Sequence, residues 1–398
     1  MKYIVIALSG AADQPIEQLD GKTPLEVAKV PNLHAFAHSG KVGLAHLAPR
    51  GFEPHPDTTL LNLLGYDADT FYTGRAPLEA ANLELKLEDN EIPFRMNFVT
   101  EANGRLEDPE AGKITTKEAK ALINFLNKKV ASDFIRFFAG AQYRHIVVIK
   151  DSHGFEALSA KTHCPHDIVG NPIEDSLPSG PGGELLTKLM FDAKLLLQDH
   201  EINQVRIDLG ENPANMIWVW GQGRKPKIDL FSKRFGCQGA LISDAGYAKG
   251  FARYTGLTVV DSRAELSDLQ ANYEEKAKLL IDELKEKDFV CLHLKECDEA
   301  SRIGDYRAKV SALESADFFI LSKLRKYVEA NRDVRVLISP CHVLPWRTRK
   351  RTRDDVPFVL AGKDVSSDEH DKCTELIAQA SELKVPKPPE LISFLLSK

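Results

Sequence analysis

Short apolar, β-branched runs alternate with longer helical stretches along most of this chain. The strand-like runs cover residues 3–8, 240–243, 257–260, 289–294, 334–338 and 357–360. The helical stretches include residues 24–38, 272–286 and 308–331, where apolar positions recur at three- and four-residue steps. Such alternation indicates βαβ units. We therefore predict an α/β fold with a mostly parallel sheet flanked by helices.

The pattern changes between residues 103 and 210. A helical stretch at 115–129, strand-like runs at 134–138 and 145–149, a turn-rich segment at 170–183 and a long helix at 184–198 follow one another. We predict a core domain of residues 1–102 and 211–398, with a smaller inserted α+β domain at 103–210. The chain of 398 residues, 43% of them hydrophobic, is long enough for both.

Charge and cysteine content limit the classes of function. The 52 Lys and Arg against 58 Asp and Glu give a formal net charge of −6, which argues against a dedicated nucleic-acid binder. The apolar run at residues 1–8 is too short for a membrane span or a signal peptide. The six cysteines are scattered and form no Cys-x-x-Cys pair, which suits a reducing compartment. We expect a cytoplasmic protein with small-molecule or protein partners and no membrane association.

Several polar residues directly follow the predicted strands. Ser9 follows the run at 3–8, Asp298 follows the run at 289–294, and Cys341 and His342 follow the run at 334–338. In open α/β sheets the ligand crevice forms beyond the carboxyl ends of the strands. We therefore expect these residues to converge at a cleft.

A series of short motifs occurs in a fixed order along the chain. They are GKTPLEVA at 21–28, YTGRAPLEA at 72–80, YRH at 143–145, PHDI at 165–168, NPANMIW at 212–218, NYE at 272–274 and VPF at 356–358. As an ordered set they resemble the archaeal-type cofactor-independent phosphoglycerate mutases of the alkaline phosphatase superfamily. The resemblance covers nearly the whole chain. It implies an alkaline-phosphatase-like core, a glycolysis-related isomerase activity and two divalent metals, Mn or Zn.

When the motifs are aligned, the chain differs from the family at the positions of its nucleophile and of most of its metal ligands. Pro56 stands at the position of the serine nucleophile, and proline has no hydroxyl group. The metal-ligand positions of the family fall on Ser9, Asp298, Arg302, Cys341, His342 and Arg351. Of these six positions and Pro56, seven in all, Asp298 and His342 match the family. A guanidinium has no free lone pair and repels a cation, so we predict a degenerate centre that binds no metal.

Other residues are candidates for binding a ligand. Arg75 and Arg144 carry planar guanidinium groups suited to a phosphate or carboxylate, although surface ion pairs are an equal alternative. The resemblance places His145, His166 and Asp167 near the ligand, and Asp57 is next to the lost serine.

Two alternatives concern the degenerate centre itself. Asp298 and Arg302 are four residues apart and would pair with each other on a helix. Cys341, His342 and Asp298 could form a remodelled zinc site, which the nearby arginines disfavour.

We predict a pseudoenzyme of the mutase family that binds a phosphorylated small acid or a protein partner. The alternative is an active phosphoglycerate mutase, or a related phosphotransferase, in which Ser9, Asp57, Thr58 or Thr59 serves as the nucleophile. A second alternative is nucleic-acid binding through residues 346–353, which carry five cations beside a tryptophan. A solvated loop is the plainer interpretation of that run.

Overall fold

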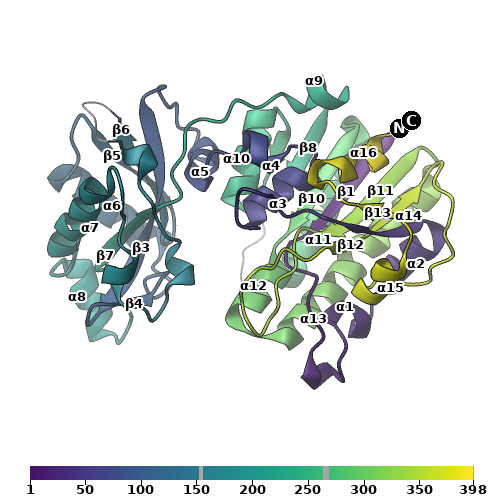
Figure 1. Ribbon diagram of the computed structural model, residues 1–398, viewed down its shortest axis with the longest axis horizontal. Helices are drawn as coiled ribbons and strands as arrows, with labels where there is room; N and C mark the ends of the chain where they lie inside the picture. The colour runs from purple at the N-terminus through teal and green to yellow at the C-terminus, as the bar shows by residue number, and fades with distance from the viewer. Residues whose placement is uncertain (152–155, 263–268, 398) are drawn as a thin grey trace. The chain divides into compact units, whose positions relative to one another are not determined.

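The computed structural model describes residues 1–151, 156–262 and 269–397. The chain forms two compact units, which Figure 1 shows: unit 1 is Met1–Tyr72 with Lys227–Lys398, and unit 2 is Thr73–Pro226. Unit 2 thus extends beyond the predicted limits of 103 and 210. The physical reason is strand pairing, because the strands at Glu91–Ala102 and Met216–Trp220 belong to the sheet of the inserted unit.

Unit 1 is built on an eight-stranded sheet. Its order is β13 (Lys384–Val385), β2 (Lys41–Ala45), β12 (Val356–Gly362), β11 (Val334–Pro340), β1 (Lys2–Leu8), β10 (Phe289–Leu294), β8 (Gly239–Ile242) and β9 (Thr258–Val260). The neighbours from β11 to β9 are parallel, and β12 pairs antiparallel with both β11 and β2. The predicted mostly parallel α/β sheet is confirmed.

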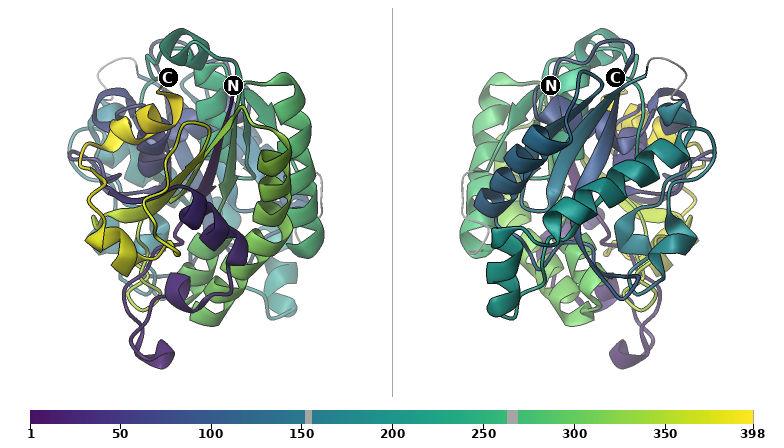
Figure 2. Two further views of the ribbon diagram at one scale, coloured as in Figure 1. Left: turned by 90° about the vertical axis from the view of Figure 1, so that its right-hand side faces the viewer. Right: turned by 90° about the vertical axis from the view of Figure 1, so that its left-hand side faces the viewer.

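Helices cover both faces of this sheet, as the left view of Figure 2 shows. They are α1 (Pro24–Val27), α2 (Pro31–Ser39), α3 (Pro56–Leu63), α4 (Ala68–Phe71), α9 (Phe231–Phe235), α10 (Gly246–Thr255), α11 (Leu269–Glu286), α12 (Glu296–Ile303), α13 (Tyr306–Ser315), α14 (Ser322–Ala330), α15 (Glu375–Ala380) and α16 (Leu391–Leu396). The apolar residues of β1, β10 and β11 pack with those of α2, α11 and α14 in one core. This core is what the three- and four-residue apolar spacing of the helices predicts.

The helix predicted at 24–38 is in fact two helices. Ala28 leaves the helical conformation, with ψ at 140°, and α2 begins at Pro31. Proline restricts the residue before it to extended conformations and suits the first position of a helix. The first turn of α2 is capped from a distance, because the Asp317 carboxylate accepts hydrogen bonds from the backbone N–H groups of Asn32 and Leu33.

The helix predicted at 308–331 is helical throughout but not uniform. Helices α13 and α14 are joined by a π-helical segment, Ala316–Leu321, which contains Asp317. Such segments insert a wider turn into an α-helix.

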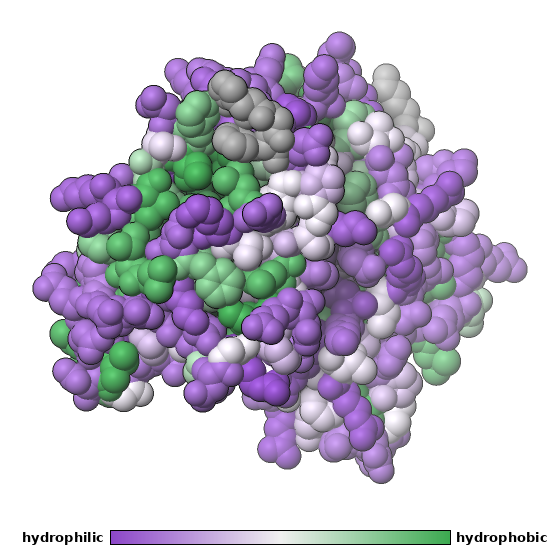
Figure 3. All heavy atoms as spheres, turned by 60° about the vertical axis from the view of Figure 1, so that its left-hand side comes forward, coloured by the Kyte–Doolittle hydropathy of each residue, from purple (hydrophilic) through white to green (hydrophobic). Residues whose placement is uncertain are grey.

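Unit 2 combines an antiparallel sheet with helices. The strand order is β4 (Arg105–Asp108), β3 (Glu91–Ala102), β6 (Arg144–Lys150) and β5 (Ile135–Ala141), and β7 (Met216–Trp220) also pairs with β3. Its helices are α5 (Arg75–Asn82), α6 (Thr116–Lys129), α7 (Gly183–Leu197) and α8 (Glu201–Asp208). The right view of Figure 2 shows helices of this unit in front of its sheet. Figure 3 shows apolar side chains gathered on one part of its surface, bordered by polar ones.

In unit 1 the predicted site residues follow the carboxyl ends of strands. In unit 2 Arg75 lies at the start of α5.

Among the described residues, no helix has the length and apolar content that crossing a membrane requires.

Candidate functional site

Three parallel strands of unit 1 end side by side at one edge of the sheet. β1 lies between β10 and β11, and the last residues of the three strands are in register. Ser9, α12 with Asp298, and the pair Cys341 and His342 follow these ends. Their approach is close, because a Cβ atom on Gly10 would lie 2.8 Å from the Cα atom of Asp298. The convergence expected from strand topology is therefore present.

Asp298 is the centre of a buried ion-pair network. Its Oδ2 accepts a hydrogen bond from Arg302 Nε at 2.6 Å, and its Oδ1 accepts one from Arg351 Nη2 at 2.8 Å. The same Oδ1 lies 2.9 Å from His342 Nε2, which is also 3.2 Å from Arg351 Nε. Both carboxylate oxygens are thus bound by side chains of the same chain. The Asp298–Arg302 pair predicted from the four-residue spacing is formed.

Burial and neighbouring charges set the protonation of this network. Burial alone would raise the pKa of Asp298, but the Arg351 and Arg302 guanidiniums hold it well below its usual range. Burial lowers the pKa of His342 to about 4, and its hydrogen bond to Asp298 offsets only part of that effect. At neutral pH the network holds two guanidiniums, one carboxylate and a neutral imidazole. It therefore has one positive charge in excess.

Pro56 is the first residue of α3, where the missing N–H group of proline costs no hydrogen bond. The neighbouring hydroxyls are engaged with the backbone. Thr58 Oγ1 and Thr59 Oγ1 donate to the carbonyl oxygen of His55 at 2.9 and 3.1 Å. Thr59 Oγ1 also lies 3.4 Å from His342 Nδ1. Thr59 is thus a hydroxyl placed beside an imidazole, and that imidazole is a weak base because burial lowers its pKa.

Asp57 and Ser9 are the other candidate nucleophiles. Asp57 is fully buried, and its Oδ2 accepts a hydrogen bond from the Tyr72 hydroxyl at 2.7 Å. The Ser9 hydroxyl is buried, with no hydrogen-bond partner among the residues that the structure describes. A serine needs an adjacent base or metal before it attacks phosphorus.

Cys341 does not favour the remodelled zinc site. Its side chain is fully buried, and burial raises the pKa of the thiol well above its usual range. Zinc binds the thiolate rather than the thiol. His342 and Asp298, the other two members of that set, already contact Arg351.

The residues present do not fit the two divalent metals that the family resemblance implies. A metal needs several carboxylate, imidazole or thiolate donors that converge on one point. Within residues 1–151, 156–262 and 269–397, no group of three His, Cys, Asp or Glu side chains could hold a metal ion. At the Asp298 centre, guanidinium N–H groups occupy the carboxylate oxygens that such an ion would bind.

The basic run at 346–353 is folded against its own chain. Arg351 enters the Asp298 centre, and Arg353 donates to backbone carbonyls, including that of Phe52 at 2.9 Å. The Arg349 guanidinium lies against Gly304 at the carboxyl end of α12. Four of the five cations of the run are exposed, namely Arg347, Arg349, Lys350 and Arg353. Nucleic-acid binding through this run stays a prediction.

A cluster of arginines lies in unit 2 on α5, β3 and β6. Glu79 Oε1 accepts hydrogen bonds from Arg95 Nη1 at 2.6 Å and from Arg75 Nε at 3.3 Å. The guanidinium carbons of Arg75 and Arg95 lie 5.9 and 5.5 Å from the ring centroid of Trp220. Arg144 is near enough to lower the pKa of Glu79. These residues form the arginine cluster of unit 2.

The arginine cluster also carries excess positive charge. Burial would raise the pKa of Glu79, but Arg95, Arg75 and Arg144 together lower it. Glu110 is the second carboxylate close to Arg144. Three guanidiniums against two carboxylates leave one positive charge in excess. Arg95 is buried, and its Nε has no hydrogen-bond partner within the described part of the chain. These are the features of an oxyanion site.

The three remaining predicted residues lie in different surroundings. His145 is buried in the sheet, where its Nδ1 accepts a hydrogen bond from Gly140 N at 3.1 Å and burial lowers its pKa to about 3. His166 Nε2 lies 3.4 Å from Glu110 Oε1, which connects it to the arginine cluster. Asp167 is exposed. The structure thus brings Arg75, Arg144 and His166 to one region.

Three members of the arginine cluster are absent from the residues predicted from the sequence. Arg95 is a lone cation in the apolar run of β3, and a charge in such a run has to be paired when buried. Glu79 lies four residues after Arg75 on α5, which is the spacing of a helical ion pair. Both signals are readable from the sequence. Trp220 has no comparable signal, because its place beside the arginines depends on the pairing of β7 with β3.

Comparisons with known proteins agree with this architecture. A family model described as 2,3-bisphosphoglycerate-independent phosphoglycerate mutase matches residues 37–203. The mutase of that name from Methanosarcina acetivorans is 38% identical over 369 residues, covering 92% of each chain. A solved structure from Pyrococcus horikoshii aligns over 100% of this chain and 97% of its own, with a TM-score of 0.80 at 24% identity.

A second solved structure, the cofactor-independent phosphoglycerate mutase of Thermoplasma acidophilum, aligns over 100% of this chain and 99% of its own. Its TM-score is 0.61, at 26% identity. The family predicted from the ordered motifs is confirmed, and the chain belongs to the 2,3-bisphosphoglycerate-independent phosphoglycerate mutase family.

Proposed function

We propose that this chain is a non-catalytic member of the phosphoglycerate mutase family that binds a phosphorylated small acid. The observation that carries the proposal is the Asp298 network, in which Arg302 and Arg351 bind both carboxylate oxygens. A dication at this place would have to displace two fixed cations from a buried carboxylate. Removing one partner from a buried ion pair is strongly unfavourable.

The nucleophile position supports the same proposal. Pro56 has no group that could attack phosphorus, and the hydroxyls of Thr58 and Thr59 donate to a backbone carbonyl. Covalent phosphoryl transfer needs an activated nucleophile. The neutral imidazole of His342 is a poor activator because burial keeps its pKa near 4.

The arginine cluster of unit 2 supports the binding part of the proposal. The guanidiniums of Arg75 and Arg95 lie over the Trp220 ring, and Arg95 forms an ion pair with Glu79. These contacts keep the excess positive charge in one place. A phosphate or carboxylate would balance that charge and accept hydrogen bonds from the guanidiniums. A phosphorylated three-carbon acid carries both kinds of group.

A coupled assay of 3-phosphoglycerate conversion, run with and without added manganese, tests the catalytic part. We expect no conversion above background under either condition. The mutase from Thermoplasma acidophilum serves as the positive control. Manganese-dependent conversion that survives repurification would overturn the proposal.

Calorimetric titration with 3-phosphoglycerate tests the binding part. We expect Arg144→Gln and Arg75→Gln each to weaken binding by about tenfold, which is the loss of one charge-assisted contact. Arg105→Gln is the matched control, because Arg105 is an exposed arginine of the same unit. Equal affinity in all four proteins would remove the arginine cluster as the ligand site.

The names of the relatives favour a second candidate function, an active phosphoglycerate mutase. The observation on its side is the approach of Thr59 Oγ1 to His342 Nδ1 at 3.4 Å. If Thr59 were the nucleophile, Thr59→Ala would abolish any conversion seen in the assay. Thr59→Ser would retain part of it.

We also propose a reducing, cytoplasmic location. Among the residues that the structure describes, none of the six cysteines forms a disulfide, and four of them are buried. Free buried cysteines are typical of proteins from reducing compartments.

A further inference from the structure

Cys164 lies in unit 2 beside a histidine and a carboxylate. It directly precedes the short 3₁₀ helix Pro165–Asp167, and its Sγ atom lies 3.9 Å from Nδ1 of His166. The other ring nitrogen of His166, Nε2, lies 3.4 Å from Oε1 of Glu110. A thiol, an imidazole and a carboxylate in this order form the arrangement that activates cysteine nucleophiles.

The carboxylate determines which nitrogen of His166 carries a hydrogen. The hydrogen bond with His166 is the largest influence on the pKa of Glu110, which lies below its usual value although partial burial opposes the shift. Glu110 is therefore ionised at neutral pH, and an ionised carboxylate can only accept hydrogen bonds. Nε2 of His166 thus donates to Glu110, and Nδ1 keeps a lone pair next to the Cys164 thiol. In this tautomer the ring can take up the proton of the thiol.

The arginine cluster of unit 2 lies next to these three side chains. The ring centroids of Tyr143 and His166 are 5.8 Å apart, and the guanidinium carbon of Arg144 lies 5.3 Å from that of Tyr143. Arg144 also contributes to the lowered pKa of Glu110. Arg95, another member of the cluster, is only 3% exposed, and its Nε has no hydrogen-bond partner within the described part of the chain. A buried guanidinium N–H without an acceptor points to an anionic ligand.

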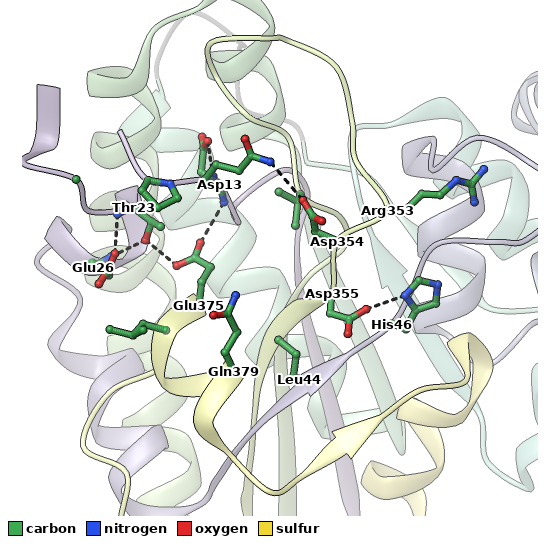
Figure 4. Close-up of a pocket in the computed structure, with 15 residues that line it drawn as sticks. Asp13, Thr23, Glu26, Leu44, His46, Arg353, Asp354, Asp355, Glu375 and Gln379 are labelled. Carbon is green, nitrogen blue, oxygen red and sulfur yellow. Dashed lines mark hydrogen bonds and ion pairs between the residues drawn. The ribbon is translucent and has the colours of Figure 1, made fainter. Parts of the chain in front are cut away.

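The pocket of unit 1, which has a volume of about 610 Å³, differs in this respect. Figure 4 shows that carboxylates in its wall are bonded within the chain. Glu375 Oε1 accepts a hydrogen bond from the Asp13 N–H group at 3.1 Å. Asp355 Oδ1 lies 2.7 Å from His46 Nδ1. These carboxylates have partners without a ligand, in contrast to the Nε of Arg95.

Exposure separates Cys164 from most of the other cysteines. Cys164 and Cys237 are partly exposed, whereas the other four are buried. Burial and the nearby charge of Asp288 raise the pKa of Cys237 to about 11, so that thiol stays protonated at neutral pH. Reactive cysteines are partly exposed and lie in electropositive surroundings. Cys164 has both features.

We propose that Cys164 is a modification site, at which its thiol forms a mixed disulfide with a small thiol compound that carries carboxylate groups. The sulfur of Cys164 is the nucleophile, and the carboxylates of the compound bind the guanidiniums of the arginine cluster. This inference goes beyond the function proposed above and does not depend on it.

The exchange needs no reagent other than the disulfide form of that compound. The Cys164 thiol passes its proton to Nδ1 of His166, and Sγ attacks one sulfur of the incoming disulfide. A new S–S bond forms as the old one breaks, and the leaving thiolate takes the proton from the imidazolium. One disulfide and one thiol are consumed and one of each is produced, so electrons and protons balance.

Oxidised glutathione and cystamine are matched probes for this site. Both are small disulfides, but the first carries carboxylates and a net negative charge, whereas the second carries two ammonium groups. Each is incubated with the full chain at neutral pH, and peptide mass spectrometry follows the adduct at each cysteine. We expect the ratio of the two rates, glutathione over cystamine, to be about tenfold higher at Cys164 than for 2-mercaptoethanol, a neutral thiol in solution.

Cys237 is the internal control in the same samples, and it should react more slowly than Cys164 because its thiol stays protonated. If no adduct forms at Cys164, or if its ratio of rates equals that of 2-mercaptoethanol, the proposal is overturned.

A histidine variant tests the activation of the thiol. His166→Gln should slow adduct formation at Cys164 by about tenfold at neutral pH, because only a few per cent of an unassisted thiol is ionised there. Near pH 9 the thiol ionises without help, so the difference from the parent should shrink. His163→Gln is the matched control: His163 is exposed and adjacent to Cys164, and the structure uses its backbone carbonyl to accept from Trp218 Nε1 at 2.8 Å. Equal rates in His166→Gln and the parent would contradict the role of the imidazole.

An arginine variant tests the choice of an anionic compound. Arg144→Gln should lower the ratio of glutathione to cystamine rates toward that of 2-mercaptoethanol. Arg105→Gln, which changes an exposed arginine of the same unit, should leave the ratio as in the parent. An unchanged ratio in Arg144→Gln would contradict the role of the arginine cluster. If His166→Gln fails to fold, the ratio measured at Cys164 in the parent still decides the question.

Discussion

Asp298 illustrates how one buried carboxylate can depend on its neighbours. Its side chain is 9% exposed, and Arg302 and Arg351 supply the positive charge that burial requires. Taking an ion out of water is costly unless a partner of opposite charge is close. The two arginines likewise need Asp298, because without it two buried or half-buried guanidiniums would repel each other.

Asp298→Asn should therefore destabilise the protein substantially. Removing one partner of a buried ion pair costs about 3 kcal/mol in the free energy of unfolding. Urea denaturation measures this change. Glu299→Gln on the same helix is the control, because that side chain is 55% exposed and its pair with Lys295 should be worth no more than about 1 kcal/mol. Equal losses in the two variants would show that the Asp298 network is not a stabilising unit.

At the residue scale, contacts between residues close in the sequence can be predicted more easily than contacts between distant ones. The Asp298–Arg302 contact follows from helical spacing, and the order of family motifs brings Arg351 and His342 to the same centre. The contact of Thr59 with His342 joins residues 283 positions apart, and no local pattern encodes it. The same holds for Tyr72, whose hydroxyl binds Asp57.

At the element scale, the start of α5 positions the arginine cluster of unit 2. Gly74 precedes this helix with φ at +139°, a conformation that side chains other than glycine rarely adopt. A Cβ atom here would lie 2.1 Å from the carbonyl oxygen of Gln222. This close contact fixes α5, and with it Arg75 and Glu79, against the segment that follows β7.

Gly74→Ala should displace the start of α5. We expect a loss of roughly 3 kcal/mol in stability, because both the φ angle and the backbone contact oppose the new methyl group. The variant should also bind 3-phosphoglycerate more weakly than the parent does. Urea denaturation and calorimetry measure the two effects.

Gly104→Ala is the matched control for this prediction. Gly104 also has a positive φ, +75°, but a Cβ there would meet nothing within 4 Å. Its expected cost is about 1 kcal/mol, from the φ angle alone. If both variants lose the same stability, the contact with Gln222 does not constrain α5.

Elements with a clear local pattern could be predicted, and those set by long-range pairing could not. The strands β1, β10 and β11 are apolar runs with helices between them, and each is present close to its predicted limits. The break at Pro31 could have been predicted from the proline itself. The predicted boundaries at 103 and 210 leave strands β3 and β7 outside unit 2, because their pairing with β6 and with each other joins distant parts of the sequence.

At the scale of the whole molecule, buried histidines make stability depend on pH. Burial lowers the pKa values of His145 and His293 to about 3 and of His342 to about 4. An unfolded histidine takes up a proton near pH 6.5, whereas these stay neutral in the folded state. Between pH 6.5 and 4 the unfolded state therefore binds more protons, and stability falls as the pH falls.

His145→Gln should remove one part of this pH dependence. Each such histidine contributes a slope of up to about 1.4 kcal/mol per pH unit between pH 6 and 4. Urea denaturation at several pH values gives the slope, which is informative even if the variant is less stable overall. His38→Gln is the control, since His38 is 73% exposed. If the stability of His145→Gln depends on pH as steeply as that of the parent, His145 is not a source of the pH dependence.

Our proposal for the whole chain is that guanidinium groups stand where the family resemblance implies two dications. Equilibrium dialysis against manganese, followed by elemental analysis, tests it most directly, with the Thermoplasma acidophilum mutase dialysed alongside. We expect manganese at the level of the buffer for this chain. Stoichiometric manganese that is lost in Asp298→Asn would contradict it.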